Sequence, residues 1–200
     1  MINVLFLPGL EGGVNGKKSR LLNSIDSINL TVVDYGNPYN IYVSYQKVLT
    51  EMIKNKFDII IASSYGTSII VYIIQIGLWT GRTILLSSAV GIMLSNRLWL
   101  PENYPNKIIF VHGNKDSLCN IESIDQFAKY PYVRIYKVND GHKLSKFINV
   151  DKLKILIDDV SFGNHKDQLF EVSFFNYWTD PLVLLITVLF SLLYFRLVKN

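Results

Sequence analysis

The stretch FDIIIASSYGTSIIVYIIQIG, residues 57–77, decides the fold. It opens with an isoleucine-rich apolar run, which is typical of a strand buried on both faces of a parallel sheet. The small residues Ala62 and Gly66 then flank Ser64 at equal spacing, and an apolar run of helical character follows. The sequence therefore predicts a strand over 57–62, a tight turn, and a helix over 67–77.

Short apolar runs alternate with helical patterns on both sides of this stretch. Such alternation is typical of βαβ units and predicts an α/β fold, a mostly parallel sheet with helices on both faces. The other strands are expected at 2–7, 30–34, 83–87, 107–112 and 133–138, and the other helices at 17–25, 41–54, 121–128 and 147–158. In an open sheet of this kind the functional groups lie at the carboxyl ends of the strands.

Ser64 has the local surroundings of a catalytic nucleophile. A serine on a strained strand-to-helix turn needs small residues two positions before and after it, so that the turn closes without Cβ clashes. Ala62 and Gly66 meet this need, while Thr67 adds bulk just beyond the turn. The backbone N–H of Tyr65 would then be one donor of an oxyanion hole. A serine two positions before a glycine occurs often by chance, so the prediction depends on the strand–turn–helix context.

A glycine-rich loop, Pro8–Gly13, follows the first predicted strand. Glycines allow backbone conformations in which N–H groups turn toward a ligand. The loop is a candidate for the other half of the oxyanion hole, with the Leu10 N–H as donor. The alternative is an ordinary strand-to-helix turn.

Two further candidates follow later strands. Asp116 lies after the fifth strand and could orient a histidine, although an exposed loop aspartate is the simpler alternative. His142 lies on a loop after the sixth strand and is the candidate base. His112 ends a strand and His165 lies in a polar stretch, so both are weaker candidates. Asp140 is expected to be a turn former.

The candidates occur in the order Ser64, Asp116, His142, which is the order of α/β-hydrolases and differs from those of chymotrypsin and subtilisin. The chain resembles a minimal lidless α/β-hydrolase, similar to esterases of the YqiA type and to acyl-protein thioesterases of the ABHD10 type. This resemblance covers roughly residues 2–158. The segments that carry it are FLPGLEGGVNGKKSRLL (6–22), DYGNP (34–38), ASSYG (62–66), VHGNKD (111–116) and NDGH (139–142).

The resemblance implies specific roles for these residues. Ser64 would be the nucleophile, His142 the base and Asp116 the orienting acid, with no metal or organic cofactor. The sequence departs from the family pattern at Pro8, where many members have histidine, and at Ala62 and Thr67, where glycine is usual or frequent. The segment 89–105 is too short for a separate lid domain and is expected to be either a small apolar flap or a helix packed on the sheet.

Composition excludes several classes of protein. Half of the 200 residues are hydrophobic and 18% are charged, which is atypical of a disordered chain or a coiled coil. The chain has 20 basic and 16 acidic residues, and the basic ones are spread along it without forming a run. This distribution argues against a nucleic-acid partner. Cys119 is the single cysteine, so an internal disulfide is excluded. It is expected to be a small buried filler.

The C-terminal stretch PLVLLITVLFSLLYFRLV, residues 181–198, is apolar around nearly its whole helical circumference and carries one charge, Arg196. Its eighteen residues would extend about 27 Å as a helix, close to the thickness of a bilayer core. The sequence thus predicts a hydrolase domain over 1–160, a linker over 161–180 and a transmembrane helix over 181–198. A single-pass C-terminal anchor would leave the domain in the cytosol. A buried C-terminal helix is the alternative.

The leading functional hypothesis is a membrane-anchored serine hydrolase that cleaves carboxylic esters or thioesters. Its substrate would be a small molecule, an acylated protein or a lipid. The rival hypothesis is a catalytically silent protein of the same fold, tethered to a membrane, that only binds a ligand or partner.

Overall fold

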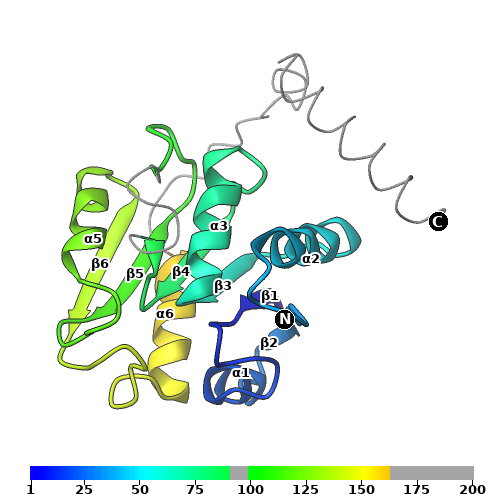
Figure 1. Cartoon of the computed structure of the whole chain (residues 1–200), viewed down its shortest axis with the longest axis horizontal. Helices are drawn as coiled ribbons and strands as arrows, with labels where there is room; N and C mark the ends of the chain where they lie inside the picture. The colour runs from blue at the N-terminus through cyan, green and yellow to red at the C-terminus, as the bar shows by residue number, and fades with distance from the viewer. Residues whose placement is uncertain (91–98, 163–200) are drawn as a thin grey trace. The chain divides into compact units, whose positions relative to one another are not determined.

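The computed structural model describes residues 1–90 and 99–162 of the chain. The described strands form one six-stranded parallel sheet in the order β2-β1-β3-β4-β5-β6 (Figure 1). They are β1 (Ile2–Leu7), β2 (Ile28–Val32), β3 (Ile59–Ser63), β4 (Arg82–Leu86), β5 (Ile108–Gly113) and β6 (Val133–Val138). The helical segments are α1 (Lys17–Asn23), α2 (Ile41–Lys54), α3 (Tyr65–Gln75), α5 (Glu122–Asp125), the 3-10 turn η1 (Gln126–Lys129) and α6 (Val150–Phe162).

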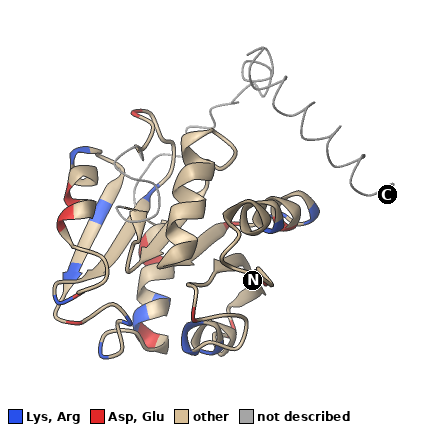
Figure 2. Cartoon of the chain, viewed as in Figure 1, with Lys and Arg blue, Asp and Glu red and all other residues tan. Residues whose placement is uncertain are grey.

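The helices cover both faces of the sheet, as the sequence predicts. Alternate residues of β3 point to opposite faces, so Ile60 and Ala62 pack with α2 and α3, whereas Ile59 and Ile61 pack with α1 and α6. The central strand β3 is therefore buried on both sides, which explains why its residues are apolar up to the final Ser63. Helix α3 carries no charged residue, as Figure 2 shows. Most of its residues are buried.

Element boundaries agree closely with the sequence-based expectation. Strands β1 and β6 and helix α2 have the predicted bounds, and α2 begins where the Asn40 side chain accepts hydrogen bonds from the N–H groups of Tyr42 and Val43. The expected helix over 121–128 is instead a single α-turn followed by a 3-10 turn. Helix α6 starts later than predicted, because Asn149 caps it by accepting from the Lys152 N–H. It also continues to Phe162, two residues into the stretch expected to be a linker.

Three expectations fall wholly or partly outside the described residues, and one of them is the linker over 161–180, of which only residues 161 and 162 are described. Residues 181–198, predicted to be a transmembrane helix, lie outside them, as do residues 91–98 of the expected flap. Within the part of the chain that the structure describes, no helix is both long and apolar enough to cross a membrane. Beyond the gap in the flap segment, Leu100 and Tyr104 are buried against the sheet, and Trp99 is exposed.

Candidate active site

Ser64 lies on the strained turn between β3 and α3. Its φ of 49° and ψ of −117° fall in a region that non-glycine residues rarely adopt. Gly66 makes this turn possible, because a Cβ atom at that position would lie 2.4 Å from the Leu7 carbonyl oxygen. The Ser64 N–H donates to the Leu86 carbonyl at 2.9 Å, which holds the turn on the end of β4. The predicted strand–turn–helix geometry is present.

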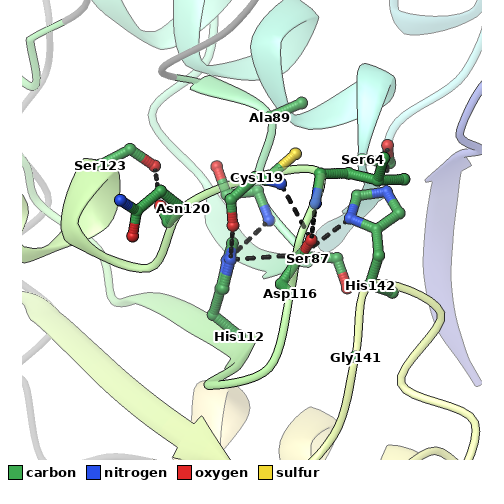
Figure 3. Close-up of polar contacts among 12 residues, drawn as sticks. Ser64, Ser87, Ala89, His112, Asp116, Cys119, Asn120, Ser123, Gly141 and His142 are labelled. Carbon is green, nitrogen blue, oxygen red and sulfur yellow. Dashed lines mark hydrogen bonds and ion pairs between the residues drawn. The ribbon is translucent and has the colours of Figure 1, made fainter.

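The three predicted polar side chains meet at the carboxyl ends of β3, β5 and β6 (Figure 3). The Nε2 atom of His142 lies 2.8 Å from Ser64 Oγ, and its Nδ1 atom lies 2.7 Å from Asp116 Oδ2. The imidazole thus joins the hydroxyl to the carboxylate in one line of hydrogen bonds. This arrangement can move a proton from the serine to the histidine while the carboxylate holds the ring in place.

Asp116 is held by contacts to both of its carboxylate oxygens. Oδ1 accepts from the N–H groups of Leu118 and Cys119 at 2.9 Å each, while Oδ2 accepts from His142. The side chain is fully buried, so the alternative of an exposed loop aspartate is wrong. A second histidine, His112, lies on the other side of the carboxylate, with Nε2 3.3 Å from Oδ2. The sequence-based interpretation did not foresee this contact.

The loop that carries His142 is shaped by Asp140, the expected turn former. Its carboxylate accepts from the N–H groups of Gly141, Lys146 and Phe147 at 2.8, 2.7 and 3.0 Å. Burial acts to raise the pKa of Asp140, but these backbone donors and Lys146 outweigh it and hold the pKa below its usual range. Asp140 therefore stabilises the loop through backbone hydrogen bonds. Among the described residues, the imidazole of His142 is hydrogen-bonded to Ser64 and Asp116 and not to Asp140.

Lysine side chains of α1 also bind this loop. Lys17 Nζ donates to the Ser145 carbonyl at 3.3 Å, and Lys18 Nζ donates to the Lys143 carbonyl at 3.2 Å. Burial, together with the nearby Lys17 charge, lowers the pKa of Lys18 to about 8. These contacts connect the segment after the glycine-rich loop to the loop of His142.

The glycine-rich loop approaches the serine from β1. Gly9 lies so close that an added Cβ would be 3.0 Å from Ser64 Cβ. The loop is closed by a hydrogen bond from the Gly12 N–H to the Gly9 carbonyl at 3.0 Å. Among the described residues, no hydrogen bond is recorded from the N–H groups of Leu10 and Tyr65 to another part of the protein.

Asp116, Cys119 and His142 offer ligand atoms that all lie within 4.8 Å of one another, close enough to bind one metal ion. Two observations weigh against such a role. The carboxylate already accepts hydrogen bonds at both oxygens. Burial and the adjacent Asp116 raise the pKa of the Cys119 thiol to about 12, which opposes the thiolate that a metal requires. Cys119 is buried, as its expected role as a filler requires.

Comparisons with known proteins agree with this fold. No protein-family model matches the chain, and neither does any curated protein sequence. Many solved structures do match. A hydrolase of the alpha/beta superfamily from Xanthomonas campestris is 17% identical with a TM-score of 0.60, covering 72% of this chain and 90% of that chain. Alpha/beta hydrolase domain-containing protein 10 from mouse is 16% identical with a TM-score of 0.62, covering 78% and 88%.

The ydeN gene product of Bacillus subtilis is similar over all of its own length and 79% of this chain, with 15% identity and a TM-score of 0.59. The matches therefore cover the greater part of both chains. The protein has the α/β-hydrolase fold.

Proposed function

We propose that this chain is a serine hydrolase that cleaves carboxylic esters or thioesters through an acyl-enzyme intermediate. The observation that carries the proposal is the unbroken line of hydrogen bonds from Ser64 through His142 to Asp116, with distances of 2.8 and 2.7 Å. A strained serine turn beside two available backbone N–H groups supports it further.

The first half of the reaction forms the acyl-enzyme. His142 Nε2 takes the proton of the Ser64 hydroxyl as Oγ attacks the acyl carbonyl carbon. The carbonyl oxygen becomes an oxyanion that accepts hydrogen bonds from the N–H groups of Leu10 and Tyr65. One such donor is typically worth about 10²–10³ in kcat. The imidazolium then gives its proton to the leaving alcohol or thiol, and the bond between the acyl carbon and that group breaks.

The second half restores the enzyme. His142 takes a proton from a water molecule, whose oxygen attacks the acyl carbon of the ester on Ser64. Collapse of the tetrahedral intermediate releases the carboxylic acid, and the imidazolium returns a proton to Ser64 Oγ. Asp116 accepts the Nδ1–H throughout, so Nε2 remains the atom that faces the serine. No step requires a metal or an organic cofactor.

The proposed substrate is an acylated small molecule, protein or lipid, and the proposed location is a membrane. The location rests on the sequence of residues 181–198, which is apolar over a length that fits a bilayer core. In this proposal the segment anchors the chain by its C-terminal end and leaves the domain on the cytosolic side.

A fluorophosphonate probe tests the enzymatic proposal directly. The probe forms a covalent bond only with an activated serine, so wild-type protein should be labelled, Ser64→Ala should not, and Ser63→Ala should be labelled like wild type. A folded wild-type protein that takes up no probe and hydrolyses no short p-nitrophenyl ester would favour the rival hypothesis of a catalytically silent binding protein.

A further inference from the structure

The turn that follows β4, Ser87–Ala89, makes hydrogen bonds to His142 and to two residues that contact the rest of the proposed catalytic triad. Figure 3 shows Ser87 and Ala89 in the region of the triad. Each of its residues makes one hydrogen bond that connects it, directly or through one other residue, to a different member of the triad. We name this segment the β4 turn.

Ser87 holds the backbone of the proposed base. Its hydroxyl donates to the His142 carbonyl at 2.5 Å, and its own N–H donates to the Val111 carbonyl at 2.8 Å. Ser87 is fully buried and has a φ of 49°, the same value as Ser64. Glycine adopts such a φ without strain. Ser87 therefore adopts a strained backbone conformation, in which its hydroxyl contacts the His142 loop.

Ser88 leads to the acid through His112. The Ser88 N–H donates to His112 Nδ1 at 3.2 Å, so the ring proton of a neutral His112 lies on Nε2. That Nε2 atom lies 2.8 Å from the Cys119 carbonyl oxygen and 3.3 Å from Asp116 Oδ2. His112 is fully buried and thus links the end of β4 to the loop that presents the carboxylate.

Ala89 leads to the nucleophile through Thr67. The Ala89 N–H donates to Thr67 Oγ1 at 2.9 Å, and the Thr67 hydroxyl donates to the Ser64 carbonyl at 2.5 Å. Thr67 is fully buried. Thr67, which departs from the family pattern, therefore joins the turn of Ser64 to the β4 turn.

We propose that the β4 turn, acting through Ser87, His112 and Thr67, positions the triad as one unit. None of these side chains lies on the line of proton transfer, so they are positioning residues and not catalytic ones. Since Ser64, Asp116 and His142 come from separate strands, their distances depend on a common support, and the β4 turn contacts the support of each. The inference rests on the proposed function.

The sharpest test compares Ser87→Gly with wild type. Glycine keeps the backbone φ without strain and removes the hydroxyl, so relief of strain offsets part of the lost hydrogen bond and the variant should still fold, as judged by circular dichroism. Its kcat for a short p-nitrophenyl ester should nonetheless fall roughly 10- to 100-fold with little change in KM, since a small misplacement of a reacting group has an effect of that order. Ser44→Ala is the matched control and should leave kcat unchanged, because it removes a buried hydroxyl of α2 that has no hydrogen-bond partner among the described residues.

His112 provides a second test with a rescue. In His112→Leu the N–H donor to the acid loop is lost, so the fluorophosphonate labelling rate should fall and the downfield proton NMR signal of the His142 Nδ1–H should shift or broaden. His112→Gln places an amide donor near the former Nε2 position and should restore both readouts toward wild type. The signal is assigned by its absence in His142→Ala.

The outcomes separate the two proposals. A wild-type protein that is labelled at Ser64, with Ser87→Gly and His112→Leu labelled at the same rate as wild type, overturns the positioning role and leaves the proposed hydrolase intact. A folded wild-type protein that shows neither labelling nor hydrolysis overturns the proposed function itself.

Discussion

Gly9 packs directly against Ser64: a Cβ atom on Gly9 would lie 3.0 Å from Ser64 Cβ and 3.6 Å from Ser64 Oγ. The glycine-rich loop therefore approaches the nucleophile more closely than a side chain on Gly9 would easily allow. Leu10, the proposed oxyanion donor, follows Gly9 directly in the chain.

Substitution of Gly9 should impair catalysis more than folding. In Gly9→Ala the new methyl group must push the loop or the serine aside, and kcat/KM for a short p-nitrophenyl ester should fall by roughly 10- to 100-fold. Gly12→Ala is the control in the same loop. The nearest atom to its added Cβ would be 3.5 Å away, an ordinary contact distance, and the φ of Gly12 is not positive. Equal activity of the two variants would show that the close contact of Gly9 with Ser64 does not matter for catalysis.

The triad residues should differ in their effects. Ser64→Ala and His142→Ala should each abolish measurable ester hydrolysis while leaving the fold intact, as judged by circular dichroism. Asp116→Asn should retain more activity than either, because His142 remains, although in a poorer tautomer. In a Ser-His-Asp triad on an unrelated fold, such a change lowers kcat by about 10⁴. Full activity of His142→Ala would exclude His142 as the base.

Gly66 should be required for stability. An alanine Cβ there would lie 2.4 Å from the Leu7 carbonyl oxygen, and backbone in the centre of the sheet cannot easily move away. Gly66→Ala should lower the free energy of unfolding by about 1–3 kcal/mol or more in chemical denaturation. At Gly141 the nearest atom to an added Cβ is 3.8 Å away, so Gly141→Ala should be close to wild type in stability.

The carboxylate of Asp140 should stabilise the fold in a pH-dependent way. Its pKa is lower in the folded protein than in the unfolded chain, so its contribution is fully present above the unfolded value near 3.8 and is lost as the pH falls through the folded value. Hydrogen bonds to a charged group typically contribute about 1.5–3 kcal/mol. Asp140→Asn should therefore be less stable than wild type at pH 7, and the difference should shrink below pH about 4.

An exposed aspartate provides the control for this experiment. Asp26 lies on the surface, and Asp26→Asn should unfold like wild type at both pH values. A stability difference between Asp140→Asn and wild type that stays constant from neutral to acid pH would contradict the assigned role of the charge.

The last prediction concerns residues 181–198. If they anchor the chain, the full-length protein should resist extraction from membranes by alkaline carbonate. A chain that ends at His165, just beyond the end of α6, should be soluble, monodisperse and still labelled at Ser64. Aggregation or unfolding of the shortened chain would place the segment in the core of the domain and refute the anchor.

Most of the fold was predictable from the sequence because its signals are local. The continuous apolar runs of the buried strands, the helical patterns between them and the small residues around Ser64 depend only on near neighbours in the chain. The sequence also predicts that Ser64, Asp116 and His142 each follow a strand directly. Since parallel strands present their carboxyl ends at one edge of the sheet, the three residues are expected to lie close together there.

The tertiary structure alone decided how these residues are supported. Ser87 and His142 are 55 positions apart, Ser88 and His112 are 24 apart, and Ala89 and Thr67 are 22 apart. No periodicity relates such pairs, because side-chain patterns report which face of an element is buried and not which loop will contact it. The full burial of the Asp116 side chain likewise depends on tertiary packing, whereas its contact with His112 joins residues only four positions apart. The sequence alone therefore identified the groups that could react, and packing between distant strand ends determined the geometry in which they meet.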